Sequence, residues 1–220
     1  MVLADPPGFG ESELSGMSMP LSTRAKVLWG VLDDVDARFA SGLSTWHLIG
    51  HGASCPTVLE MANLYPDSVR SQVHVSPCLP VDDRGRLFKS GRRAMVRLLE
   101  KNLCDARSFA QFIARAAGKP LPDYVWEPMW RPYTRPRARN GLTDFLLAEN
   151  PVHAMRDFCP SMAIWGGRDP LMPSLERESV LRLLPDVETH VIRAAGHFPM
   201  ETHSRALRDF LRGWIKYVEE

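Results

Sequence analysis

The sequence lacks the features that mark membrane-spanning, secreted and nucleic-acid-binding chains. No apolar run approaches the ~20 residues that a helix needs to cross a bilayer, and the first residues show neither the charged nor the apolar region of a signal peptide. A net charge of +1, from 27 basic and 26 acidic residues, gives no strong field to attract nucleic acid. We therefore expect a cytoplasmic protein with neither a nucleic-acid nor a membrane partner.

Cysteine is also scarce. The chain has four cysteines, Cys55, Cys78, Cys104 and Cys159. Their spacing fits neither a disulfide framework nor a zinc site, so we expect a reducing compartment, no metal and no cofactor. The 220 residues, 45% of them hydrophobic, are enough for one large core with an insertion.

Short apolar runs alternate with amphipathic stretches along most of the chain. The apolar runs predict strands at residues 2–4, 46–49, 69–75, 161–165 and 189–192. Helical periodicity predicts helices at 21–39, from 56 onward, at 175–184 and at 204–218, with Ser22 or Thr23 as the N-cap of the first. Strand, helix and strand in this order predict right-handed parallel crossovers, hence an α/β fold with a mainly parallel sheet.

The pattern changes between residues 78 and 150. Amphipathic helices are expected at 91–103, 108–117 and 141–148, and the stretch 119–139 is crowded with proline, tryptophan and arginine. We interpret this region as a helical cap inserted between sheet strands. The expected organisation is core residues 1–77, cap residues 78–150 and core residues 151–220.

Four motifs, most of them at the ends of predicted strands, carry a family resemblance. They are Asp5-Pro-Pro-Gly-Phe-Gly-Glu-Ser12, Leu48-Ile-Gly-His-Gly-Ala-Ser-Cys55, Ile164-Trp-Gly-Gly-Arg-Asp-Pro170 and Ala195-Gly-His-Phe-Pro199. In this order they resemble the capped branch of the α/β-hydrolase superfamily, which includes epoxide hydrolases, haloalkane dehalogenases, C–C bond hydrolases and esterases. The second motif resembles the family's nucleophile elbow, and the last two resemble the loops that supply its acid and its histidine.

The resemblance implies roles for individual residues. His197 matches the family's general base and Asp169 its acid partner, while the backbone N–H of Ala53 matches an oxyanion donor. His51 matches the residue before the nucleophile and is expected to support the turn. Gly52, however, stands where the family has its serine, and glycine has no side chain to attack a carbonyl. A covalent serine intermediate at that position is excluded.

Several functions stay open at this stage. His197 could act as a general base on a water beside Gly52 or on a substrate proton. The protein could instead be a catalytically silent member that binds a ligand or a partner. Ser54 or Cys55 could supply a nucleophile in a shifted elbow and make the protein an esterase, although an N-cap role for Ser54 and a core position for Cys55 are the simpler expectations.

The resemblance also marks a departure at the N-terminus. In the family the Asp-x-Pro-Gly loop follows the fourth strand, so this chain starts there and the N-terminal meander is expected to be absent. We interpret the sequence as a fragment, a chain with a mis-assigned start, or one that borrows a strand.

The expected ligand is a small, largely apolar molecule. Trp126, Trp130 and Tyr133 could line its pocket, or they could pack the cap onto the sheet domain. The first function that we predict is hydrolase-like general-base chemistry by His197 and Asp169. The oligomeric state is left open.

Overall fold

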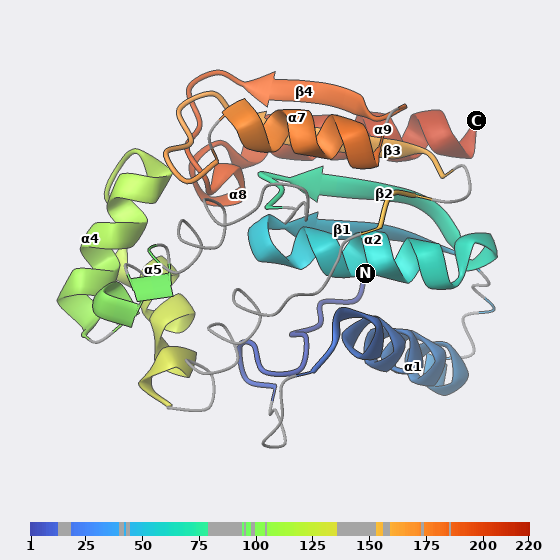
Figure 1. Ribbon diagram of the computed structural model, residues 1–220, viewed down its shortest axis with the longest axis horizontal. Coiled ribbons are helices and arrows are strands. Elements are labelled where there is room, and N and C mark those ends of the chain that lie inside the picture. Colours follow the sequence, from blue (N-terminus) through green and yellow to red (C-terminus); the bar gives the residue numbers. More distant parts are fainter. Residues whose placement is uncertain are drawn as a thin grey trace.

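The computed structural model describes most of the chain. The described residues are 1–12, 19–39, 42, 45–78, 94, 96, 97, 100–103, 105–135, 153–155, 159–172, 174–184 and 186–220. The expected helix at 141–148 lies outside them, and the one at 91–103 lies partly outside. Within the described residues, helices and strands form layers around a sheet (Figure 1).

Among the residues that the structure describes, the sheet has four parallel strands in the order β1-β2-β3-β4. Their bounds are β1 Trp46–His51, β2 Val69–Val75, β3 Ser161–Gly166 and β4 Glu188–Ile192. In the register, Ile49 faces Val73, Val73 faces Met162, and Ile164 faces His190. The central strands β2 and β3 are buried along nearly their whole length, as expected when helices cover both faces of a parallel sheet.

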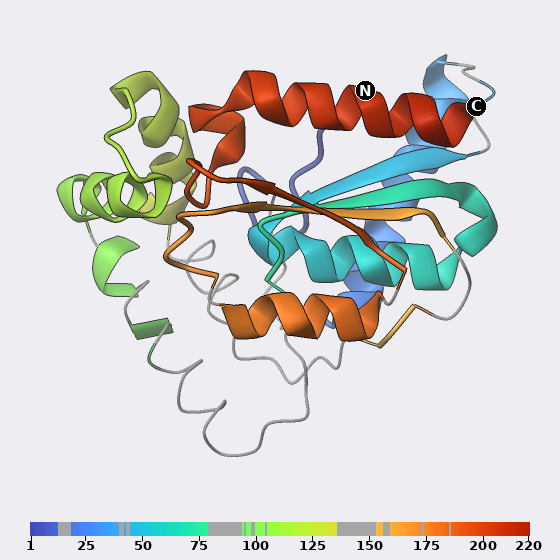
Figure 2. The same ribbon diagram turned by 90° about the horizontal axis from the view of Figure 1, so that it is seen from above.

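Helices cover both faces of this sheet. Helices α1 (Leu21–Phe39), α2 (Cys55–Leu64) and α7 (Ser174–Leu183) lie on one face, and α9 (Ser204–Glu219) lies on the other (Figure 2). On the first face Leu59 and Leu184 pack against Trp165, while on the second Leu207 and Trp214 pack against β2 and β3. None of the described helices is long and apolar enough to span a bilayer.

A group of helices lies beyond the carboxyl ends of the strands (Figure 1). It contains α4 (Ala106–Ala117), α5 (Asp123–Trp130) and η3 (Arg131–Thr134). Asp105 caps α4 by accepting a 2.9 Å hydrogen bond from Ser108 N–H, and Gly118 ends the helix in the left-handed conformation. Phe109, Phe112 and Ile113 form a separate apolar cluster there, so α4 and α5 are stabilised by their own small core.

Two local predictions were wrong. Residues 2–4 form no strand, because a strand needs a hydrogen-bonded neighbour and, among the described strands, β1 pairs with β2 alone. The first helix starts at Leu21, and the amides of Thr23 and Arg24 both donate to the carbonyl of Pro20, so neither Ser22 nor Thr23 is its N-cap. The proline-rich stretch 119–139, for which no element bounds were predicted, contains α5, which tolerates Pro128 near its end.

Candidate active site

The end of β1 forms a sharp turn into helix. Gly52 has φ 54°, a left-handed conformation that a residue with a side chain adopts only with strain. The chain then passes through a short 3-10 helix, Gly52–Ser54, into α2. The amide of Cys78 donates a 3.1 Å hydrogen bond to the carbonyl of Gly52 and so ties the turn to the end of β2. The backbone shape of an elbow is therefore present without a side chain at its apex.

His197 and Asp169 meet beside this turn. His197 Nδ1 lies 2.8 Å from Asp169 Oδ2, and because the ring donates to the carboxylate, Nδ1 carries the hydrogen and Nε2 is left bare. The other carboxylate oxygen, Oδ1, accepts the amides of Leu171 at 2.8 Å and Met172 at 3.2 Å. The His197 amide donates to the carbonyl of Ala116 at 2.8 Å, which joins the histidine loop to α4.

The pair is deeply buried, with the Asp169 side chain 1% and the His197 side chain 10% exposed. Burial alone raises the pKa of the Asp169 carboxyl. The hydrogen bond from His197, the charge interaction with that ring and the two backbone amides together outweigh burial, so the pKa is lowered from its ordinary value. Asp169 is thus an ionised acceptor that holds the His197 ring in one tautomer and orientation.

The bare nitrogen of His197 faces the apex of the turn. A Cβ placed on Gly52 would lie 3.2 Å from His197 Nε2. No described residue forms a hydrogen bond with this nitrogen. A hydroxyl on such a side chain, or a small molecule in the space that it would fill, can therefore be reached by His197 as a base.

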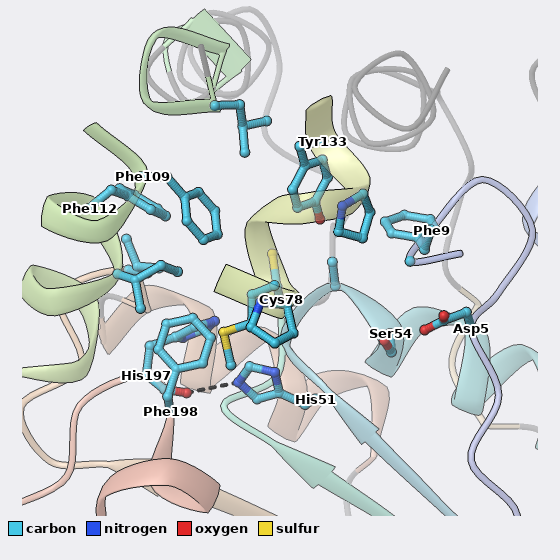
Figure 3. Close-up of a pocket in the computed structure, with 18 of the residues that line it drawn as sticks. Asp5, Phe9, His51, Ser54, Cys78, Phe109, Phe112, Tyr133, His197 and Phe198 are labelled. Carbon is cyan, nitrogen blue, oxygen red and sulfur yellow. Dashed lines mark hydrogen bonds between the residues drawn. The ribbon is translucent and has the colours of Figure 1, made fainter. Parts of the chain in front are cut away.

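His51 is the second imidazole of the site. Its Nε2 lies 2.8 Å from the carbonyl oxygen of His197, and since a carbonyl only accepts, Nε2 must donate (Figure 3). The two rings are 4.8 Å apart between centroids. Burial, followed by the charge interaction with His197, lowers the pKa of His51 to about 4, so the ring is neutral at physiological pH.

Both histidines line a cavity of about 1100 Å³. Most of its remaining wall is apolar and rich in rings, contributed by Phe9, Phe109, Phe112, Tyr133 and Phe198 (Figure 3). Burial, and then the charge of Asp5, raise the pKa of the Tyr133 hydroxyl, which keeps it protonated. The cavity joins the elbow, the histidine loop and the helices beyond the strand ends, and its polar atoms are concentrated at a few points of an apolar wall.

The structure brings only some of the predicted residues to this cavity. His197, Ala53, Ser54 and Tyr133 line it, whereas Trp126 and Trp130 pack around the apolar cluster of α4. These two tryptophans are thus packing residues of that cluster.

The two nucleophile candidates of a shifted elbow differ in accessibility. Cys55 is 0% exposed in the core, and burial raises the pKa of its thiol well above the ordinary value. Ser54 occupies the N-cap position of α2, as expected, but its side chain makes no capping hydrogen bond. It lies apart from His197, on the side of Asp5 (Figure 3). Among the described residues, neither side chain forms a hydrogen bond with His197.

Sequence reasoning missed Phe109, Phe112 and Phe198 as cavity residues, and it missed the bond between His51 and the backbone of His197. The aromatic spacing on α4 could have indicated a buried face, but not which cavity that face borders. Within the described ranges, no three His, Cys, Asp or Glu side chains gather as they would around a metal ion.

Comparison with known proteins adds sequence and structural likenesses. Residues 2–210 match the profile of a family described as the alpha/beta hydrolase family. No curated protein matches the sequence significantly.

Solved structures with similar folds have low sequence identity. An esterase from Thermogutta terrifontis with bound malate is similar at TM-score 0.73 and 20% identity, over 98% of this chain and 79% of that one. An esterase from Exiguobacterium antarcticum gives TM-score 0.76 and 14% identity, over 98% and 80%. MGS-M2, an alpha/beta hydrolase from a Medee basin deep-sea metagenome library, gives TM-score 0.70 and 15% identity, over 96% and 78%. At these identities the likeness concerns the fold.

Proposed function

The chain belongs to the alpha/beta hydrolase family, as its motifs and fold led us to expect, and we propose that it is a hydrolase without a covalent serine intermediate. Its ligand is a small, largely apolar molecule bound in the cavity of about 1100 Å³. His197 acts there as general base and Asp169 orients it. The supporting observation is the 3.2 Å between His197 Nε2 and the position of a Cβ on Gly52, a space that water or a substrate hydroxyl fills.

The proposed chemistry assigns a task to each group. His197 Nε2 takes a proton from the water or hydroxyl, and Asp169 stabilises the imidazolium that forms. The backbone N–H of Ala53, at the start of the helical turn that leads into α2, is the oxyanion donor, because the positive end of a helix favours developing negative charge. Residues 78–150, in this proposal, cap the cavity and hold the apolar part of the ligand.

A panel of p-nitrophenyl esters tests the proposal. The wild-type chain is expected to hydrolyse at least one ester without labelling by a serine-directed phosphonate, and His197→Ala is expected to abolish that turnover. His190→Gln changes a histidine on β4 outside the cavity and serves as the matched control. Turnover that survives in folded His197→Ala would refute the general-base role, and a phosphonate adduct on Ser54 would refute the absence of a covalent intermediate.

The missing side chain at Gly52 also favours a second candidate, a family member that binds a ligand or partner without turning it over. Ester hydrolysis by Ser54 or Cys55 is less well supported, because Cys55 is fully buried and Ser54 lies toward Asp5 (Figure 3). Specific binding to a folded chain that hydrolyses none of the esters would favour the silent binder.

A further inference from the structure

Hydrogen bonds to neighbouring groups determine the tautomers of both active-site histidines. His51 must carry its hydrogen on Nε2, since that atom bonds to the carbonyl of His197 at 2.8 Å. His197 must carry its hydrogen on Nδ1, since that atom bonds to the ionised Asp169 at 2.8 Å. The remaining nitrogens, His51 Nδ1 and His197 Nε2, have lone pairs and can only accept hydrogen bonds.

Both bare nitrogens belong to rings that line the same cavity, and neither bonds to a described residue. The ring centroids are only 4.8 Å apart. Rings at this spacing suit two donors carried on adjacent atoms of one ligand, each forming a hydrogen bond of about 2.8 Å. The other labelled residues of the cavity are the aromatic side chains of Phe9, Phe109, Phe112, Tyr133 and Phe198, together with Asp5, Ser54 and Cys78 (Figure 3).

We propose that His51 Nδ1 and His197 Nε2 form a paired acceptor site, and that the cavity selects largely apolar molecules with two neighbouring hydroxyl groups. An aromatic diol matches this chemistry, since its ring packs among Phe109, Phe112 and Phe198 while its hydroxyls donate to the two imidazoles. In an ether of the same shape a methoxy group replaces a hydroxyl, so one imidazole nitrogen would be left without a hydrogen-bond donor in an apolar cavity. A site that binds a substrate hydroxyl by a hydrogen bond discriminates strongly against an analogue that lacks this hydroxyl.

This inference rests on the proposed use of the cavity as a ligand site, but not on turnover. In the ligand complex His197 Nε2 would accept from a hydroxyl of the substrate, so the proton that the general base removes comes from the substrate itself. His51 remains a neutral acceptor across physiological pH, because burial keeps its pKa at about 4.

Isothermal titration calorimetry with catechol, guaiacol and veratrole tests the paired site, since these molecules share one ring and carry two, one and no hydroxyl donors. We expect catechol to bind tightest and the affinity to fall about tenfold with each lost donor. Equal affinities, or no detectable catechol binding up to its solubility limit, would overturn the proposal.

Two substitutions separate the acceptor role of His51 from support of the His197 backbone. His51→Gln retains an amide that can donate to the His197 carbonyl but loses the acceptor at Nδ1, so catechol and guaiacol should bind alike. His51→Asn places an oxygen near the Nδ1 position and loses the other bond, so the preference for catechol should persist. His190→Gln is the control and should leave all three affinities unchanged. A wild-type preference in folded His51→Gln would overturn the proposal.

Nitrogen NMR of histidine-labelled wild-type protein supplies a test that needs no variant. His51 should show a protonated Nε2 and an unprotonated Nδ1, and the reverse tautomer would refute the paired site. Failure of the proposed function is distinguishable. Catechol preference without ester turnover would reject hydrolysis alone, whereas His197-dependent turnover without any preference among the three ligands would reject the paired acceptor site alone.

Discussion

Introducing a serine at the apex of the turn should create covalent chemistry that Gly52, which has no side chain, cannot perform. In Gly52→Ser the new Cβ would lie 3.2 Å from His197 Nε2, so the hydroxyl, one bond farther on, can reach that nitrogen. The left-handed φ of 54° strains any side chain there by about 1–2 kcal/mol. A hydrogen bond from the hydroxyl to His197 recovers about 0.5–1.5 kcal/mol. The net change in folding free energy is therefore small.

Gly52→Ala separates the strain from the hydroxyl. It carries the same backbone cost without the hydrogen bond, so its Tm should fall by about 2–8 °C, more than that of Gly52→Ser. Gly52→Ser should release a burst of one equivalent of p-nitrophenolate from p-nitrophenyl acetate and should be labelled once by a phosphonate probe. Gly52→Ala, and Gly52→Ser combined with His197→Ala, should show neither.

The refuting result is a Gly52→Ser chain that is folded by circular dichroism and shows no burst and no adduct. Such an outcome would mean that His197 Nε2 does not face the apex as a base. A burst of equal size in the double variant would also refute the reasoning, because the serine would then react without His197.

Three further outcomes are expected. Complete burial lowers the pKa of His74 to about 4, so as the pH falls below about 6.5 the unfolded chain binds a proton at this residue before the folded chain does. Urea denaturation should therefore show that the free energy of unfolding falls by about 2 kcal/mol between pH 7 and pH 5 because of His74. The variant His74→Gln should show a smaller fall. Asp169→Asn should lower His197-dependent turnover by roughly 10²–10⁴-fold, because an amide does not hold the Nδ1–H tautomer, and an unchanged pH–rate profile would contradict this. Cys55 should resist iodoacetamide in the native protein and react in urea, as peptide mapping can show, whereas rapid native labelling would contradict its 0% exposure.

Local sequence patterns predicted the core elements well. Helix α1 and strand β2 have the predicted bounds, Leu21–Phe39 and Val69–Val75, since an amphipathic period and a continuous apolar run between turn residues are local signals. The pairing of His197 with Asp169 was also expected, from motifs that resemble a known family. Such motifs transfer because the loops at the ends of neighbouring parallel strands meet at one edge of the sheet.

Features that depend on distant contacts could not be predicted in the same way. Residues 2–4 have the apolar character of a strand, but strand formation depends on a neighbour, and Leu3 is 85% exposed. Helix α5 was hidden by Pro128, whose penalty is offset by packing of Trp126 and Met129 around the α4 cluster. The bond from His51 to the backbone of His197 joins residues 146 positions apart, and no spacing in the sequence indicates it.

Glycine at position 52 changes the chemistry of the site without changing its shape. The turn is held by the bond from the Cys78 amide to the Gly52 carbonyl and by the start of α2, and His197 is held by Asp169, Ala116 and His51. None of these contacts needs a nucleophile, so its absence leaves the imidazole of His197 in place. On our proposals, such a site reacts through a hydroxyl that solvent or ligand brings, and two bare imidazole nitrogens beside Gly52 bind a ligand that donates two hydrogen bonds more tightly than one that only accepts them.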